Sequence, residues 1–128
     1  MVRKNMTNNE IYIIATQLVD NMANLNLHLP VKVNFYLQKN MTAIISIAED
    51  LEKSRNEILE KYGTRNEEDG NYQFEDDALQ EANKELLDLF SLEQEVPIYE
   101  ISLEAFDGVE LDSKQVQAIA YMIKEEEE

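Results

Sequence analysis

The chain has no cysteine, no tryptophan, one histidine, two prolines and three glycines in 128 residues. Without cysteine it has no disulfides, no thiolate ligands for zinc and no cysteine nucleophile. The single histidine, His28, excludes sites built on a histidine pair, and its neighbours Leu27 and Leu29 favour a helix-junction residue over a general base. The glycines are too far apart to form a phosphate-binding loop. Carboxylates are therefore the only abundant side chains suited to catalysis or metal binding.

Long hydrophobic runs are also missing. No apolar stretch approaches the roughly 18 residues of a membrane span. The first four residues carry the positive charge of a signal peptide, but the apolar run at residues 11–15 is too short to continue one. We therefore expect a cytoplasmic protein that does not enter a membrane.

Positive charge is scarce, with 11 Lys and Arg against 27 Asp and Glu, a net charge of −16. This balance argues against direct binding to DNA, RNA or anionic lipid, because phosphate contacts need cations. The hydrophobic content of 44% is too high for a simply disordered acidic chain. We expect one domain over residues 1–124 and a frayed acidic tail over 125–128, whose glutamates oppose the dipole of the last helix.

The acidic excess lies entirely in the second half of the chain. Residues 1–62 contain seven basic and seven acidic residues, whereas residues 63–128 contain four basic and twenty acidic residues. Such asymmetry says more about the binding partner of a protein than about its fold. It predicts an electronegative face on the second half.

Two helices are expected in the first half. Thr7 and Glu10 have the spacing of a capping box, and apolar residues at helical spacing follow over residues 8–26. From Leu29 the pattern is ambiguous: apolar residues alternate over 29–36 as in a strand, yet a stripe of period 3.6 runs over 30–62. We favour one helix over 30–62 and keep a strand over 29–36 as the alternative.

A helix of that length raises a question of size. It would be about 50 Å long, whereas a globule of this chain length is roughly 35 Å across. The helix must therefore project and need a partner, or bend, or be interrupted by the strand.

Turns and short strands are expected in the second half of the chain. Gly63 has the position of a C′ residue that ends the long helix, and Asp69 with Gly70 predicts a turn. Residues 71–74 and 96–101 read as strands that we expect to pair with each other, with a helix between them that begins at 75–77. Asp112 and Gln115 predict the cap of a last helix. The fold class is mainly α with a minor β element (α+β): about four helices and a short two-stranded antiparallel pair.

The spacing of the carboxylates decides whether they could form a calcium site or a catalytic site. Aligning Gly70 with the glycine of an EF-hand places Arg65 at position 1 and Asp76 at position 12, where calcium needs an aspartate and a glutamate. Glu81, Glu85 and Asp88 share a helix face, but this face is opposite the apolar stripe and is expected to be solvated. We therefore predict no catalytic, metal or cofactor site, and a protein that is not an enzyme.

Residues 29–40, 61–63, 67–74 and 89–96, with Ile98, resemble small uncharacterised acidic proteins encoded by phages and prophages of Gram-positive hosts. The similarity runs over about residues 7–123 and includes no biochemical motif. It implies a viral origin, a host cytoplasm and a protein-binding role, and it carries no functional residues over to this chain.

We therefore expect a non-catalytic protein that binds a protein with a basic surface, as an acidic nucleic-acid mimic that inhibits a host-defence nuclease or complex. The alternative is a phage assembly protein that forms homo-oligomers through its long helix. The candidate partner-binding residues are Glu67, Glu68, Asp69, Glu75, Asp76, Asp77, Glu81, Glu85 and Asp88.

Overall fold

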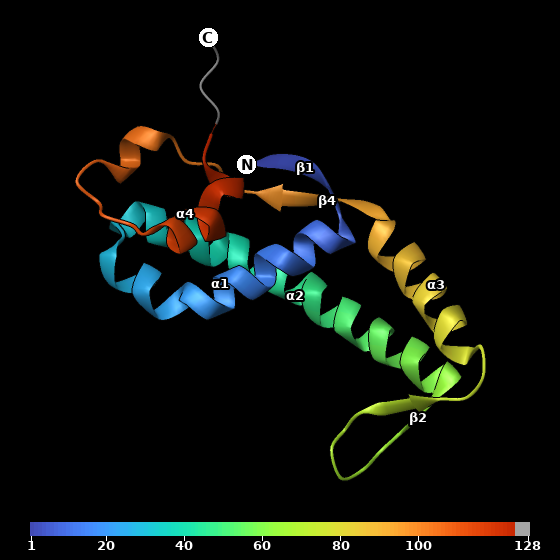
Figure 1. Ribbon diagram of the computed structural model, residues 1–128. Coiled ribbons are helices and arrows are strands. Elements are labelled where there is room, and N and C mark those ends of the chain that lie inside the picture. Colours follow the sequence, from blue (N-terminus) through green and yellow to red (C-terminus); the bar gives the residue numbers. More distant parts are fainter. Residues whose placement is uncertain (125–128) are drawn as a thin grey trace.

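The computed structural model describes residues 1–124, apart from the side chains of residues 22–28 (Figure 1). Four α-helices and two small antiparallel sheets confirm the expected α+β class within this part of the chain. The elements are β1 (Val2–Thr7), α1 (Asn8–His28), α2 (Val31–Tyr62), β2 (Gly63–Arg65), β3 (Tyr72–Phe74), α3 (Ala78–Ser91), β4 (Glu93–Ile98) and α4 (Ser113–Ile119), with 3-10 turns at Leu103–Phe106 and Ala120–Met122. The predicted tail at 125–128 lies outside the described residues.

Helix α1 begins at the predicted capping box. The backbone N–H of Glu10 donates to Thr7 Oγ1 at 3.1 Å, and the Thr7 N–H donates to Glu10 Oε1 at 3.4 Å. A second capping box, between Asp112 and Gln115, begins α4 as expected. Helix α1 ends two residues later than predicted, at His28, so the histidine stands at a helix junction by its backbone. The His28 side chain lies outside the described residues.

Helix α2 is one unbroken helix of 32 residues, so the alternative strand over 29–36 is wrong. Val33 and Leu37, four residues apart, are both fully buried. The alternating pattern included Val31 and Phe35 as well, and these are 88% and 56% exposed. The alternation therefore did not mark one buried face, whereas the period of 3.6 did.

The expected pairing of 71–74 with 96–101 is wrong. Strand β3 pairs instead with β2, directly across the turn, with Gly63 opposite Phe74 and Arg65 opposite Tyr72. A hairpin closes a short loop and so loses less entropy than a pairing across an intervening helix. Strand β4 begins earlier than expected, at Glu93, and ends at Ile98, before Ile101.

The partner of β4 is β1, the first strand of the chain. The pair is antiparallel and runs from Val2 opposite Ile98 to Thr7 opposite Glu93. Pro97 lies within β4, as a two-stranded sheet permits because each strand has a free edge. No strand was expected at 2–7, since this segment is largely polar and its pairing partner lies far along the chain.

Gly63 ends α2 as predicted, but as the C-cap residue and not as a left-handed C′ residue. Its φ of −130° is extended, and its N–H donates to the carbonyl of Leu59. A Cβ here would lie 2.7 Å from Phe74 Cε1 and 2.9 Å from the carbonyl oxygen of Gln73. The close approach of β3 therefore explains why glycine occupies this position.

The main hydrophobic core lies between α1, the first half of α2, α4 and the β1–β4 sheet. Its largest buried side chains include Ile11, Leu18, Ile44 and Ile98. On α2 this core ends at Ala48. We call residues 1–48 and 92–124 the body.

The remaining described residues, 49–91, form what we call the arm: the rest of α2, the β2–β3 hairpin and α3. Figure 1 shows α3 beside the C-terminal half of α2, with the hairpin at the far end from α4. Leu51, Leu59 and Ala82 are buried here, where α2 and α3 contact each other. Helix α2, about 48 Å long, thus projects from the body and is covered by a helix of the same chain.

One fully buried polar side chain, Asn40, ties α2 to the segment that follows β4. Its Oδ1 accepts from the Tyr99 N–H at 2.7 Å, and its Nδ2 donates to the Tyr99 carbonyl at 3.0 Å. The amide therefore satisfies both backbone groups of a residue that lies outside regular secondary structure.

Replacing Asn40 by leucine keeps a similar volume and leaves both Tyr99 backbone groups without these partners. We expect Asn40→Leu to lower the free energy of unfolding by about 2–4 kcal/mol, measured by urea denaturation. Ser46→Ala, at an exposed position of the same helix, is the control and should stay within about 0.5 kcal/mol of the parent. Equal stability of the two variants would contradict the role given to Asn40.

Candidate partner-binding surface

The arm is the most acidic part of the described chain. Its 43 residues, 49–91, include fourteen acidic and five basic residues, a net charge of −9. Five of these carboxylates belong to α2 and precede Gly63, so the division of the chain into halves assigned them to the neutral part. The three-dimensional unit of negative charge is therefore the arm rather than the second half of the sequence.

The turn of the β2–β3 hairpin presents Glu67, Glu68 and Asp69. Its backbone is fixed by its own side chains: Asn66 Oδ1 accepts from the Glu68 N–H, and Asp69 Oδ1 accepts from the Asn71 N–H, both at 2.9 Å. Gly70 follows with φ +75°, the left-handed conformation that the predicted turn requires. Asp69 thus shapes the turn, whereas Glu67 and Glu68 extend exposed carboxylates from it.

Three carboxylates precede α3. Asp76 has φ +48°, an unusual conformation for a residue other than glycine, and Asp77 is the N-cap residue. The Asp77 side chain makes no capping hydrogen bond, and Glu75, Asp76 and Asp77 are all exposed. Negative charge interacts favourably with the N-terminal end of the helix dipole. The chain therefore tolerates three neighbouring carboxylates here.

On α3 the three predicted carboxylates differ. Glu81 and Asp88 are exposed, and no ion pair or hydrogen bond of their carboxylates occurs within the described residues. Glu85 instead accepts a hydrogen bond from Lys61 Nζ at 3.0 Å, an ion pair that joins α3 to the last turn of α2.

The ion pair changes the titration of both partners. The hydrogen bond from Lys61, and then the nearby Tyr62 hydroxyl, hold the pKa of the Glu85 carboxyl below its ordinary value. The same contact with Glu85 raises the pKa of Lys61. Of the nine candidate residues, Glu85 is thus committed to the arm itself rather than to a partner.

Two large apolar side chains of α3 are exposed among these carboxylates. Leu79 is 47% exposed and Leu87 is 69% exposed. Together with the exposed Asn83 they follow each other at intervals of four residues, which places them along one side of the helix. The two leucines therefore add apolar contact points to this acidic surface, which the charge pattern of the sequence does not reveal.

Seven of the nine predicted carboxylates have no hydrogen bond or ion pair within the described residues: Glu67, Glu68, Glu75, Asp76, Asp77, Glu81 and Asp88. They extend along one projecting unit, from the hairpin turn to the last turn of α3. Among the side chains that the structure describes, no group of three or more His, Asp or Glu is arranged to hold a metal ion. The arrangement is suited to long-range electrostatic attraction of a basic surface.

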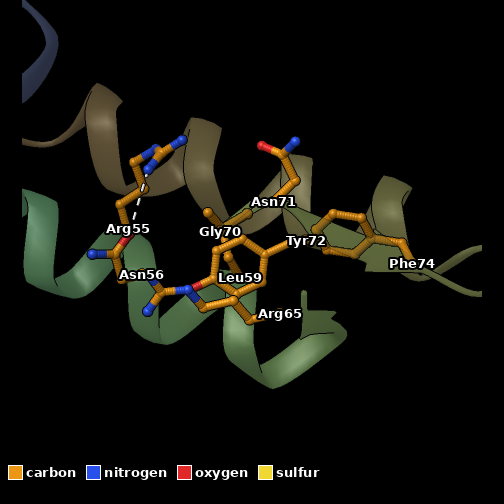
Figure 2. A pocket seen from close by; sticks show the side chains of 8 residues that line it. All are labelled: Arg55, Asn56, Leu59, Arg65, Gly70, Asn71, Tyr72 and Phe74. Carbon is orange, nitrogen blue, oxygen red and sulfur yellow. Dashed lines mark hydrogen bonds between the residues drawn. The ribbon is translucent and has the colours of Figure 1, made fainter. Parts of the chain in front are cut away.

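The arm also contains a pocket that the sequence analysis missed, between the end of α2 and the hairpin (Figure 2). It includes Arg55 and Arg65, two of the three arginines of the chain. A sequence signal existed, since arginine is rare here and both of these flank the end of one helix. The sequence alone does not show that they lie close together, because they are ten positions apart.

No family model, curated protein or solved structure matches this chain. Among the helices of the described part, none combines the length and the apolar character that crossing a membrane requires.

The Lys61–Glu85 pair makes the stability of the arm depend on pH. Because the pKa of Glu85 is lowered in the folded protein, the pair stabilises the fold above the ordinary value of 4.5, and this contribution is lost as the pH falls through the lower, folded value. Because the pKa of Lys61 is raised, the contribution is complete below 10.5 and is lost as the pH rises through the raised value.

We therefore expect Glu85→Gln to melt below the parent between about pH 4.5 and 10.5, with the difference closing at lower pH. Thermal denaturation followed by circular dichroism from pH 3 to pH 9 measures it. Glu81→Gln removes an exposed, unpaired carboxylate of the same helix, and should not show this pH profile. A difference for Glu85→Gln that persists undiminished at pH 3 would contradict the pairing.

Proposed function

We propose that this protein binds a protein partner with a basic surface through its arm, and that it acts as a non-catalytic inhibitor that mimics nucleic acid. In this proposal it is a phage-type protein that works in the host cytoplasm against a defence nuclease or complex. The observation that carries the proposal is the row of exposed carboxylates, without partners in the described chain, on a unit that projects from the body.

The electrostatic argument rests on placement. A nuclease holds its substrate in a channel lined by Lys and Arg, so a ligand with a similar negative potential is attracted to the same channel. The arm carries a net charge of −9 over 43 residues, and α3 fixes part of it on a rigid helix packed on α2. Because the backbone that carries them is already ordered, these carboxylates lose less freedom on binding than they would on a flexible chain, which favours affinity.

The exposed leucines of α3 add a second contribution. Protein interfaces draw much of their binding energy from a few apolar or aromatic anchors enclosed by a polar rim. Leu87 has this setting, since it is 69% exposed and Asp88 adjoins it on α3. We therefore expect a partner that combines a basic surface with an apolar recess.

The charge contribution is tested by reversing Glu81 and Asp88. We expect the double variant Glu81→Lys, Asp88→Lys to bind a nuclease partner at least tenfold more slowly, and to show a weaker dependence on salt. Surface plasmon resonance of the full chain against a panel of purified nucleases with basic channels, from 50 to 500 mM salt, gives both quantities.

The matched control makes the same change of charge on the body, as Glu104→Lys, Glu110→Lys, where both residues are exposed. It should change association much less. Binding that does not respond to salt, or that falls equally in both double variants, would refute recognition through the arm. A nuclease that binds the protein and keeps its activity would refute inhibition but not recognition through the arm.

A second candidate function is assembly into homo-oligomers. It is favoured by an apolar hollow of about 300 Å³ between α1 and α2, to which Tyr12, Val19 and Ile45 contribute. Val19 is 54% exposed at its edge. Against this function, the long apolar stripe of α2 that would need another chain is covered in the arm by α3.

Light scattering after size exclusion separates the two functions. If the chain assembles through the hollow, the parent forms a dimer or larger species at 100 µM, and Val19→Asp returns it to the monomer. A parent that is monomeric at this concentration would eliminate assembly as the second function.

A further inference from the structure

The pocket of the arm is lined without a single carboxylate, in the most acidic part of the described chain. It has a volume of about 460 Å³, within the range of small-molecule sites. Fourteen acidic residues belong to the arm, yet the polar side chains of the lining are two arginines, two asparagines and a tyrosine. The local chemistry of the pocket is thus opposite to that of the surface around it.

The two arginines have no ion pair within the described residues. The ion pairs found there are those of Arg3, Lys4 and Lys61. Arg55 Nη1 makes one long hydrogen bond of 3.4 Å, to Oδ1 of the neighbouring Asn56. Figure 2 shows the guanidinium groups of Arg55 and Arg65 at the same end of the pocket, on either side of the Asn56 amide. Their donors are therefore available to an added acceptor.

The hairpin brings these cations together. Arg55 belongs to α2, and Arg65 is the last residue of β2, which the turn directs back toward the end of the helix. Gly70 lies beside the guanidinium of Arg65: a Cβ there would be 3.7 Å from Arg65 Nη2, an ordinary contact, so the position requires glycine for its backbone conformation and not for space. Gly70 has a φ of +75° and forms the turn of the hairpin. The same residue therefore shapes the turn and borders the pocket.

The rest of the lining is apolar and partly aromatic. Tyr72 and Phe74, two residues apart on β3, present their rings on one face of the strand, and Leu59 contributes from α2. All three side chains are partly or fully buried. The Tyr72 hydroxyl lies 3.5 Å from Glu60 Oε1, and Glu60 itself is not part of the lining. The pocket thus combines an anion-binding end with a surface for a flat ring.

We propose that this pocket binds a small phosphate monoester that carries a ring, of the chemical class of a nucleoside monophosphate. Two guanidinium forks favour a phosphate over a carboxylate, because one fork already satisfies the two oxygens of a carboxylate. A single phosphate fits better than a nucleic acid, since the surrounding carboxylates of the arm repel a polyanion. This site is independent of the surface of α3 that is proposed to meet a protein.

Isothermal titration of the full chain with AMP, GMP, CMP and UMP tests the site, with inorganic phosphate and adenosine as fragments. We expect at least one nucleotide to bind with a Kd below 1 mM, and at least tenfold more tightly than either fragment. The affinity should fall between pH 7.5 and pH 5, as the phosphate dianion takes up a proton near pH 6 and becomes a monoanion.

Arg55→Gln and Arg65→Gln should each weaken nucleotide binding at least tenfold. The control Lys53→Gln removes the same charge from the same helix outside this pocket, and should change binding less than twofold. Circular dichroism verifies that each variant folds, and chemical-shift changes at Gly70 and Asn71 locate the ligand. Loss of binding in all three variants would contradict the site, because a general effect of charge would then account for the binding.

Failure of all four nucleotides to bind at 5 mM would overturn the proposal. Tight binding of a phosphotyrosine peptide, with none of the nucleotides, would overturn it in favour of a protein ligand. Neither result bears on recognition of a basic partner, because that test reverses Glu81 and Asp88 on α3.

Discussion

Helix α2 extends beyond the body, and the rest of the structure follows from the need to cover its apolar stripe. A body of this size covers the helix only as far as Ala48, where the main core ends. Beyond that point Leu51 and Leu59 would be exposed to water, at a cost of about 1.5–3 kcal/mol for each large side chain. The chain meets this requirement by turning back at Gly63 and placing α3 against the same helix. The hairpin exists because this return needs a turn.

Features set by local chemistry could be predicted from the sequence, and features set by distant contacts could not. The capping boxes at Thr7 and Asp112 and the turn at Gly70 depend on residues within a few positions of each other, and all three are as expected. The pairing of β1 with β4 has no local signal, because the polar segment 2–7 gains its place only from the strand opposite it. Gly63 shows the intermediate case: the helix end was expected, but the reason for glycine at this position is the close approach of Phe74 on β3.

The candidate site divides in the same way. Acidic residues of α3 and of the turn could be found by counting charges, whereas the internal partner of Glu85 depends on Lys61, at the end of another helix. The exposure of Leu87 depends on which side of α3 the rest of the fold covers, and the sequence does not show this. The pocket required the fold, since only the return of the hairpin over the last turns of α2 brings Arg55 and Arg65 to one place. Cations gathered there lie within a field of carboxylates, which limits the charge that any ligand can bring.

The β1–β4 sheet has a consequence for the order in which the molecule folds. Val2 pairs with Ile98, 96 residues further along the chain, so β1 finds its place only after β4 has been made. The arm depends on contacts between neighbours in sequence and is complete once Ser91 is available. An acidic, highly charged unit thus takes shape while the apolar faces of α1 and α2 still wait for β4 and α4. Charge repulsion between nascent chains at that stage opposes their aggregation, an effect that follows from the charge of the arm alone.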